Sequence, residues 1–162
     1  MGAGKSKLGK KLAVKLNIPF FDSDSLIEEI EKLSIDQLFK SKGEAYFRMM
    51  EKKVIDDFQS KGDFVLSVGG GLPCNGNLMN DLNDLGTTIY LKHSSGILHQ
   101  RLKHNKLNRP LLLDLSEEEM KVFIENKLTE RELFYMQSKL ILKTEEQSVN
   151  EIIRQYRLLQ KN

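Results

Sequence analysis

Residues 2–16 read GAGKSKLGKKLAVKL, and this stretch gives the first indication of the fold. Gly4, Lys5 and Ser6 match the end of the phosphate-binding loop G-x-x-x-x-G-K-[ST], in which the lysine reaches the outer phosphates and the hydroxyl binds Mg²⁺. Apolar residues at helical spacing follow, so we predict a helix that begins near Gly4 and directs its positive N-terminal end at an anion. The alternative is a flexible, basic N-terminus.

The composition of the 162 residues is that of one globular domain, spanning residues 1–162. The chain is 40% hydrophobic and 30% charged, so we expect a core and no disorder. A net charge of +2 argues against a broad nucleic-acid surface, and no apolar run approaches the roughly 20 residues of a membrane span. Cys74 is the one cysteine, and we expect it to pack rather than to act as a nucleophile. One cysteine and no secretory signal indicate the cytoplasm.

Helical and strand-like patterns alternate along the chain, which predicts a central parallel sheet with helices on both faces, a three-layer α/β/α fold. The predicted strands are residues 19–22, 63–68, 87–92 and 139–143. Helices are predicted from near residue 4 to 18, at 23–33, from a capping box at 34–37, at 44–60, at 94–104, from a second capping box at 116–119, and from about 148. The polar stretch 92–110 is a candidate lid region, and we place the lid at about 104–116.

Two carboxylates follow the first predicted strand. Asp22 and Asp24, in FFDSD, point the same way in an extended chain, and ligands of parallel sheets bind at the carboxyl ends of the strands. Such a pair can serve a metal ion and a substrate hydroxyl. The alternative is that these residues cap a helix beginning near Ser25.

Glycines and arginines supply further candidates. Three glycines in GGGLPC (69–74) directly follow a predicted buried strand, which favours a substrate lying against the main chain over a plain turn. Arg48, in GEAYFR, has the planar fork that suits a carboxylate, although a solvated helix arginine is the alternative.

The second half of the chain adds two more arginines. Arg109, in NRP, is placed to act from a lid on a transferring phosphoryl group. Arg131, in TERELFY, has glutamates on both sides, so a surface ion pair is an alternative for it. The three histidines lack metal-ligand spacing, and we assign them to the surface. They are His93, His99 and His104.

In their order and intervals, GAGKS, FFDSD, GEAYFR, GGGLPC, NRPLL and ERELFY resemble the shikimate kinase family through nearly the whole chain. The resemblance implies that ATP phosphorylates the 3-hydroxyl of shikimate, on the route to chorismate and the aromatic amino acids. It also implies a nucleoside-monophosphate-kinase fold with five parallel strands and a lid, and a substrate-binding region at about residues 22–60.

Site roles follow from the same resemblance. ATP would be bound by Gly2, Ala3, Gly4, Lys5, Ser6, Lys7, Arg109 and, as a weaker candidate stacking on adenine, Arg101. Mg²⁺ would be held by Ser6 and, through water, by Asp22. Shikimate would be bound by Asp24, Arg48, Gly69, Gly70, Gly71 and Arg131. Lys5, Asp24 and Arg109 would be catalytic, with Asp24 holding the substrate hydroxyl and helping to accept its proton.

The sequence departs from the family pattern at two places. Lys7 stands where the family usually has Thr or Ser, and we expect this to be tolerated because Ser6 keeps its role. The first glycine of the loop and the strand before it would lie upstream of Met1. That strand is central in the family, and a strand of about five or six residues contributes several buried aliphatic side chains. We therefore expect its absence to split the sheet, and a native start about ten residues upstream.

Two alternative functions stay open. One is another small-molecule P-loop kinase, such as a gluconate kinase, whose substrate would not need a carboxylate clamp of Arg48 and Arg131. The other is a truncated nucleotide-binding module without catalysis. For the leading interpretation we expect ATP and shikimate as ligands, no nucleic acid or membrane partner, and a monomer.

Overall fold

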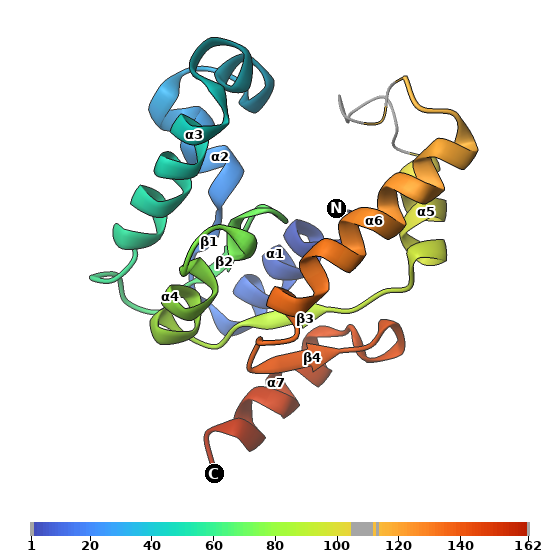
Figure 1. Ribbon diagram of the computed structural model, residues 1–162. Coiled ribbons are helices and arrows are strands. Elements are labelled where there is room, and N and C mark those ends of the chain that lie inside the picture. Colours follow the sequence, from blue (N-terminus) through green and yellow to red (C-terminus); the bar gives the residue numbers. More distant parts are fainter. Residues whose placement is uncertain (1, 105–111, 113, 162) are drawn as a thin grey trace.

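The computed structural model describes residues 2–104, 112 and 114–161 (Figure 1). The elements, in chain order, are α1 (Lys5–Leu16), β1 (Phe20–Asp22), α2 (Ser23–Glu31), α3 (Ile35–Asp56), β2 (Val65–Ser67), the 3-10 turn η1 (Leu72–Cys74), α4 (Leu78–Leu85), β3 (Ile89–Leu91), α5 (Ser95–Lys103), α6 (Glu117–Tyr135), β4 (Leu140–Leu142), the 3-10 turn η4 (Thr144–Glu146) and α7 (Val149–Leu159). All four predicted strands are therefore confirmed.

The described strands are parallel but form two pairs rather than one sheet. β1 pairs with β2, with Phe21 opposite Leu66, and β3 pairs with β4, with Tyr90 opposite Ile141. Within the described residues, β2 and β3 have no hydrogen-bonded strand between them, so the predicted split of the sheet is confirmed. Two strands alone have only marginal stability in water. Each pair is therefore stabilised by the helices that cover it.

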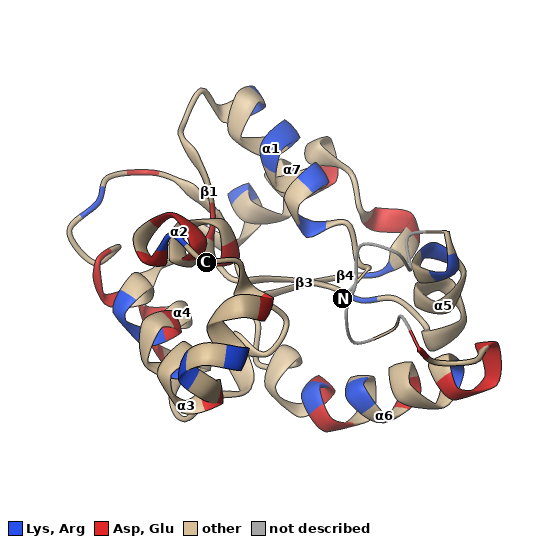
Figure 2. Ribbon diagram, turned by 90° about the horizontal axis from the view of Figure 1, so that it is seen from above, with Lys and Arg blue, Asp and Glu red and all other residues tan. Residues whose placement is uncertain are grey.

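Helices cover both faces of the strands, as the alternating pattern predicts. Figure 2 shows α1 and α7 on one side of β3 and β4, with α3, α4 and α6 on the other. Leu12 of α1 and Ile152 of α7 pack with Leu91 and Leu142 of the strands in one core layer. On the other face, residues of α3, η1 and α4 pack against Leu66 and Val68. The three-layer arrangement thus rests on apolar contacts on both faces.

Local signals place most helix ends correctly. Ser34 and Ser116 each form the predicted capping box, and Ser148 caps α7. The helices predicted from residue 34 and over 44–60 are one continuous element, α3, interrupted by Gly43 with φ of +79°. That backbone conformation favours glycine, so the kink lies where the sequence separates the two helices.

One helix, α4, is not predicted by the sequence patterns. It has eight residues and lies in a stretch rich in Asn, Asp and Gly, which is typical of a loop. Its apolar side chains nevertheless share one face, and Leu78, Met79 and Leu82 are buried. Packing beneath η1 therefore stabilises a helix that local propensity does not favour.

The elements that carry the predicted site residues lie on two sides of the N-terminal loop. Figure 1 shows α2 and α3 on one side, α5 and α6 on the other, and the N-terminus between them. The carboxyl ends of the strands open toward the same region, because Asp22, Gly69 and Thr144, which end or follow β1, β2 and β4, line one cleft. None of the described helices is both long enough and apolar enough to cross a membrane.

Candidate active site

A cleft of about 1070 Å³ lies at the carboxyl ends of the strands. It brings together residues 2–7 of the predicted phosphate loop with Asp22, Asp24, Gly69, Gly70, Arg101 and Arg131. These residues come from five separate stretches of sequence, so the fold assembles in one place most of what the motifs predict. Among the described candidates, Arg48 and Gly71 do not line the cleft, although Arg48 lies directly against Gly71.

The main-chain conformation of the loop at the start of the chain is suited to binding an anion. Gly2 and Gly4 have φ of +70° and +86°, values that only glycine adopts without strain. Gly4 is the N-cap of α1 and provides no side-chain cap, so the positive end of α1 faces the cleft through backbone N–H groups. The Lys5 side chain follows in the first turn of this helix and lines the same cleft.

Ser6 and Asp22 form the contact that joins the loop to β1. The Ser6 hydroxyl donates to Oδ2 of Asp22 at 2.7 Å, while Oδ1 of Asp22 accepts from the backbone N–H of Asp24 at 3.2 Å. Asp22 is therefore also the N-cap of α2, so the capping alternative is correct for this residue. Within the described chain no group of three or more His, Cys, Asp or Glu residues could hold a metal. Two hard oxygen donors beside a phosphate loop nevertheless fit Mg²⁺, which usually takes one or two protein ligands plus phosphates and water.

Asp24 lies in the cleft, and the neighbouring Ser23 hydroxyl contacts its carboxylate. The Ser23 hydroxyl lies 3.4 Å from Oδ1 of Asp24 and accepts from the backbone N–H of Gly69 at 2.9 Å. Burial, and then the Asp22 carboxylate, raise the pKa of Asp24 above its ordinary value, and the Lys5 ammonium opposes this. A raised pKa suits a carboxylate that takes a proton from a substrate hydroxyl.

The glycine run lets the main chain pass close to Asp24 and Arg48. A Cβ atom on Gly69 would lie 2.7 Å from Oδ1 of Asp24, and one on Gly71 would lie 2.9 Å from Nη1 of Arg48. No side chain fits at either position without displacing these groups. The close approach therefore favours glycine at both positions, beyond the needs of a turn.

Arg48 is held in place rather than solvated. Its Nη1 donates to Oε2 of Glu51 at 2.7 Å, and its Nη2 donates to Oε1 of Glu44 at 2.8 Å. Glu51 is only 1% exposed, and burial raises the pKa of its carboxyl while Arg48 opposes the change. The guanidinium orientation is thus set by a buried partner on the same helix.

Arg131 reaches the cleft from the opposite side, on α6. Its neighbours in sequence bond elsewhere: Glu130 pairs with Lys127 at 2.7 Å and Glu132 with Lys92 at 2.8 Å. The surface ion pair considered for Arg131 is therefore made by lysines instead. One helical turn later, the Tyr135 hydroxyl donates to the carbonyl oxygen of Gly70. Tyr135 belongs to the motif TERELFY, but no sequence pattern assigns it a role, although its i+4 spacing from Arg131 places both on one helix face.

Comparison with known proteins identifies the family of the chain. The family model described as shikimate kinase matches residues 1–159. The shikimate kinase of Azobacteroides pseudotrichonymphae is 42% identical over 154 residues, covering 94% of this chain and 91% of its own.

The chain belongs to the shikimate kinase family.

Solved structures give the same result. A shikimate kinase from Bacteroides thetaiotaomicron has a TM-score of 0.89 and 36% identity, covering 99% of this chain and 94% of its own. The Acinetobacter baumannii shikimate kinase, solved in complex with shikimate, has a TM-score of 0.80 and 30% identity, covering 99% of this chain and 87% of its own. The fold predicted for a shikimate kinase is thereby confirmed.

The remaining residues expected to contact ATP are Lys7, Arg101 and Arg109. Arg101 and Lys7 both line the cleft, and Nη1 of Arg101 donates to the carbonyl oxygen of Ala3 at 3.3 Å. Arg109 lies outside the described residues, as do residues 105–111 and 113 of the predicted lid.

The assignment of all three histidines to the surface is wrong for two of them. His93 is 3% exposed and His99 is 7% exposed, whereas His104 is exposed. His93 lies two residues after the buried end of β3 and has hydrogen-bond partners from distant segments, and His99 lies on the inner face of α5. Spacing along the sequence reveals neither environment.

Cys74 lies half-buried in η1, directly after the glycine run. Burial raises the pKa of its thiol, with the charges of Arg131 and Arg48 opposing the change. A raised pKa disfavours the thiolate, which supports a packing role over a nucleophilic one.

Proposed function

We propose that this shikimate kinase family member transfers the terminal phosphoryl group of ATP to the 3-hydroxyl of shikimate. One observation carries the proposal: the phosphate loop, the supported Asp24 carboxylate and the Arg131 side chain line a single cleft at the carboxyl ends of the strands. Phosphoryl transfer needs positioning and charge neutralisation more than covalent chemistry, and these groups supply both.

The nucleotide side of the site is the loop of residues 2–7. Backbone N–H groups at the start of α1 hold phosphate oxygens, and Lys5 neutralises charge on the outer phosphates. Ser6 and Asp22 would hold Mg²⁺, Asp22 through water, and the ion would shield the negative charge of the phosphates. Arg101, Lys7 and the lid residue Arg109 complete the set proposed to contact ATP.

The acceptor side begins with Asp24. Its carboxylate accepts a hydrogen bond from the substrate hydroxyl, orients that oxygen for in-line attack and takes its proton as the new bond forms. Ser23 and the Gly69 backbone keep the carboxylate in place. Arg48 and Arg131 bind the substrate carboxylate from two helices, and the ring lies against the main chain of the glycines 69–71. We further propose that the protein works as a monomer in the cytoplasm, the single cysteine being compatible with a reducing compartment.

ADP release by the purified chain, measured with shikimate and with gluconate, tests the proposal. Shikimate-dependent release of ADP, with phosphate appearing on the 3-hydroxyl by NMR, is the expected result. Release of ADP with gluconate but not with shikimate would favour the other kinase class. A folded chain that binds ATP yet is inert toward both acids would instead indicate a nucleotide-binding module without catalysis.

Tyr135→Phe is expected to raise the KM for shikimate about five-fold while the KM for ATP stays within two-fold. The hydroxyl holds the Gly70 carbonyl, and without it the glycine run is less well positioned against the substrate. The aromatic ring, which packs 5.1 Å from that of Tyr90, is retained. Steady-state kinetics with each substrate varied in turn measures the effect.

Tyr90→Phe is the matched control for Tyr135→Phe. The Tyr90 hydroxyl is buried, and in the described part of the chain it has no hydrogen-bond partner. Its removal should leave both KM values within two-fold. Equal changes in the two variants would show that loss of any phenol in this cluster, rather than the Gly70 contact, causes the effect.

A further inference from the structure

A polar cluster centred on a buried histidine lies against the phosphate loop, at the carboxyl ends of β3 and β4. His93 is its centre and is 3% exposed. Its Nδ1 lies 2.8 Å from Oγ1 of Thr144, and its Nε2 lies 2.9 Å from Nη1 of Arg101 and 3.2 Å from the carbonyl oxygen of Ala3. The imidazole thus touches three segments that are far apart in sequence, and one of them is the loop itself.

The partners of the ring define which nitrogen carries the proton. The Arg101 guanidinium is always protonated and can only donate, so Nε2 of His93 must accept from it. The proton is then on Nδ1, which donates to the Thr144 hydroxyl. Nη1 of Arg101 has two hydrogens, and the second one serves the Ala3 carbonyl at 3.3 Å. In this neutral tautomer no hydrogen lies between Nε2 and the Ala3 carbonyl oxygen 3.2 Å away, so that oxygen accepts from Arg101 rather than from His93.

The surroundings of His93 favour the same neutral form. Burial, and then the charge of Arg101, lower the pKa of the imidazole below its ordinary value. The cluster is also anchored from below, because Gln147 donates to the carbonyl oxygens of Lys92 and Leu142 at 3.2 and 3.0 Å. Gln147 therefore links the ends of β3 and β4, which fixes the backbone that carries His93 against the loop.

We propose that His93 is a positioning residue for the nucleotide: by accepting from Arg101 it directs that guanidinium onto the Ala3 carbonyl and so holds the phosphate loop in its anion-binding conformation. The inference rests on the proposed function only in taking ATP as the ligand. Gly2 and Gly4, on either side of Ala3, both have positive φ, so the peptide units around Ala3 depend on outside contacts to stay oriented. His93 itself touches no reacting atom and acts through Arg101.

Two substitutions of His93 separate this role from simple packing. In His93→Gln the amide oxygen reaches the position of Nε2 and can accept from Arg101. In His93→Asn the shorter amide overlaps Nδ1, so the Thr144 contact is retained and the Arg101 contact is lost. We expect His93→Asn to weaken ATP binding about ten-fold and His93→Gln to stay within about three-fold of the wild type.

The readout is the Kd for Mg²⁺–ATP, measured by calorimetry without shikimate, together with the Tm of each variant. Because no acceptor is present, a wild-type chain that binds ATP but does not phosphorylate shikimate would contradict the proposed function and leave this test usable. The KM for shikimate, measured in parallel, should stay within two-fold in both variants. Equal ATP affinity in Asn and Gln variants, or losses that follow Tm alone, would overturn the role of His93.

Thr144→Val covers the case in which His93→Asn does not fold. The substitution keeps the shape of residue 144 but removes the acceptor for Nδ1 of His93. The ring proton then moves to Nε2, which can no longer accept a hydrogen bond from Arg101. ATP binding should weaken about three-fold at unchanged Tm. Wild-type ATP affinity in this variant would count against the proposal.

Discussion

Asp24→Asn is expected to lower kcat about a thousand-fold while the Kd for ATP stays within two-fold. The amide keeps the shape of the carboxylate but cannot take a proton from the substrate hydroxyl. We expect ATP binding to be spared because the proposed phosphate site is the start of α1 with Lys5, whereas Asp24 lies at the start of α2 beside Gly69. Single-turnover phosphoryl transfer, with nucleotide binding measured separately, gives the two quantities.

The raised pKa of Asp24 determines the direction of the change in Tm in Asp24→Asn and of the pH dependence of kcat/KM in the wild type. Because burial raises this pKa, the ionised carboxylate opposes folding at neutral pH, so Asp24→Asn should have a Tm equal to or above that of the wild type. That advantage should shrink as the pH falls through the raised pKa toward the ordinary aspartate value, since the wild-type carboxyl is then protonated. The kcat/KM of the wild type should fall in the same window, because only the carboxylate accepts a proton.

Asp63→Asn is the control for this prediction. Asp63 is exposed in the loop before β2 and does not line the cleft. Its substitution should leave kcat, ATP affinity and the acid limb of the pH profile unchanged. Near-normal turnover in Asp24→Asn would remove Asp24 from its role, whatever the behaviour of the control.

Arg48→Met is expected to raise the KM for shikimate about a hundred-fold with little change in the KM for ATP. The methionine keeps much of the aliphatic volume but lacks the fork that binds a carboxylate. It also leaves Glu51 buried without its partner, which raises the cost of ionising that group and lowers stability. The measured KM therefore has to be separated from a loss of folded protein.

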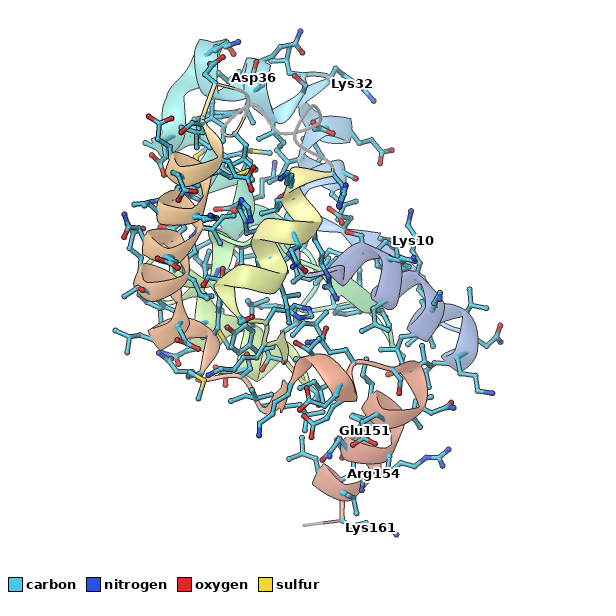
Figure 3. All side chains as sticks on the ribbon, turned by 90° about the vertical axis from the view of Figure 1, so that its right-hand side faces the viewer. Lys10, Lys32, Asp36, Glu151, Arg154 and Lys161 are labelled. Carbon is cyan, nitrogen blue, oxygen red and sulfur yellow. The ribbon has the colours of Figure 1, made fainter. Side chains whose placement is uncertain are left out.

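The double variant Arg48→Met, Glu51→Gln provides that separation, because it removes the buried charge together with its partner. It should recover Tm but not shikimate affinity. Arg154→Met is the matched surface control: Figure 3 shows Arg154 and Glu151 close together on α7, and Arg154 is 60% exposed. Recovery of shikimate affinity in the double variant would show that Arg48 acts on stability alone.

Much of the fold follows from short-range patterns. The four strands, the two capping boxes and the last helix lie where apolar spacing and cap residues predict, because these signals act over a few residues. The pattern fails for α4, whose polar, glycine-flanked sequence becomes helical only because its apolar face is buried beneath η1. Propensity is a weak guide where tertiary packing provides the stability.

The residues of the candidate site also fall into those that local sequence patterns predict and those that depend on tertiary contacts. Lys5, Ser6, Asp22, Asp24 and the glycines 69–71 are predicted from sequence because each motif is contiguous and its chemistry is local. Tyr135 and His93 are not found, because their partners are 65 and 90 positions away, Gly70 and Ala3 respectively. A tyrosine at the end of a helix and a histidine after a strand have no spacing that predicts such contacts.

The order of six short motifs is enough to assign the chain to the shikimate kinase family and to name most residues of the cleft, because a phosphate loop, a carboxylate and arginine forks have the same chemistry wherever they stand. Folding alone decides how those groups are held. Arg48 depends on the buried Glu51, Asp24 on Ser23 and the Gly69 backbone, and the loop around Ala3 on Arg101 and His93. Burial and long-range hydrogen bonds set these orientations, and both arise only when distant segments pack together.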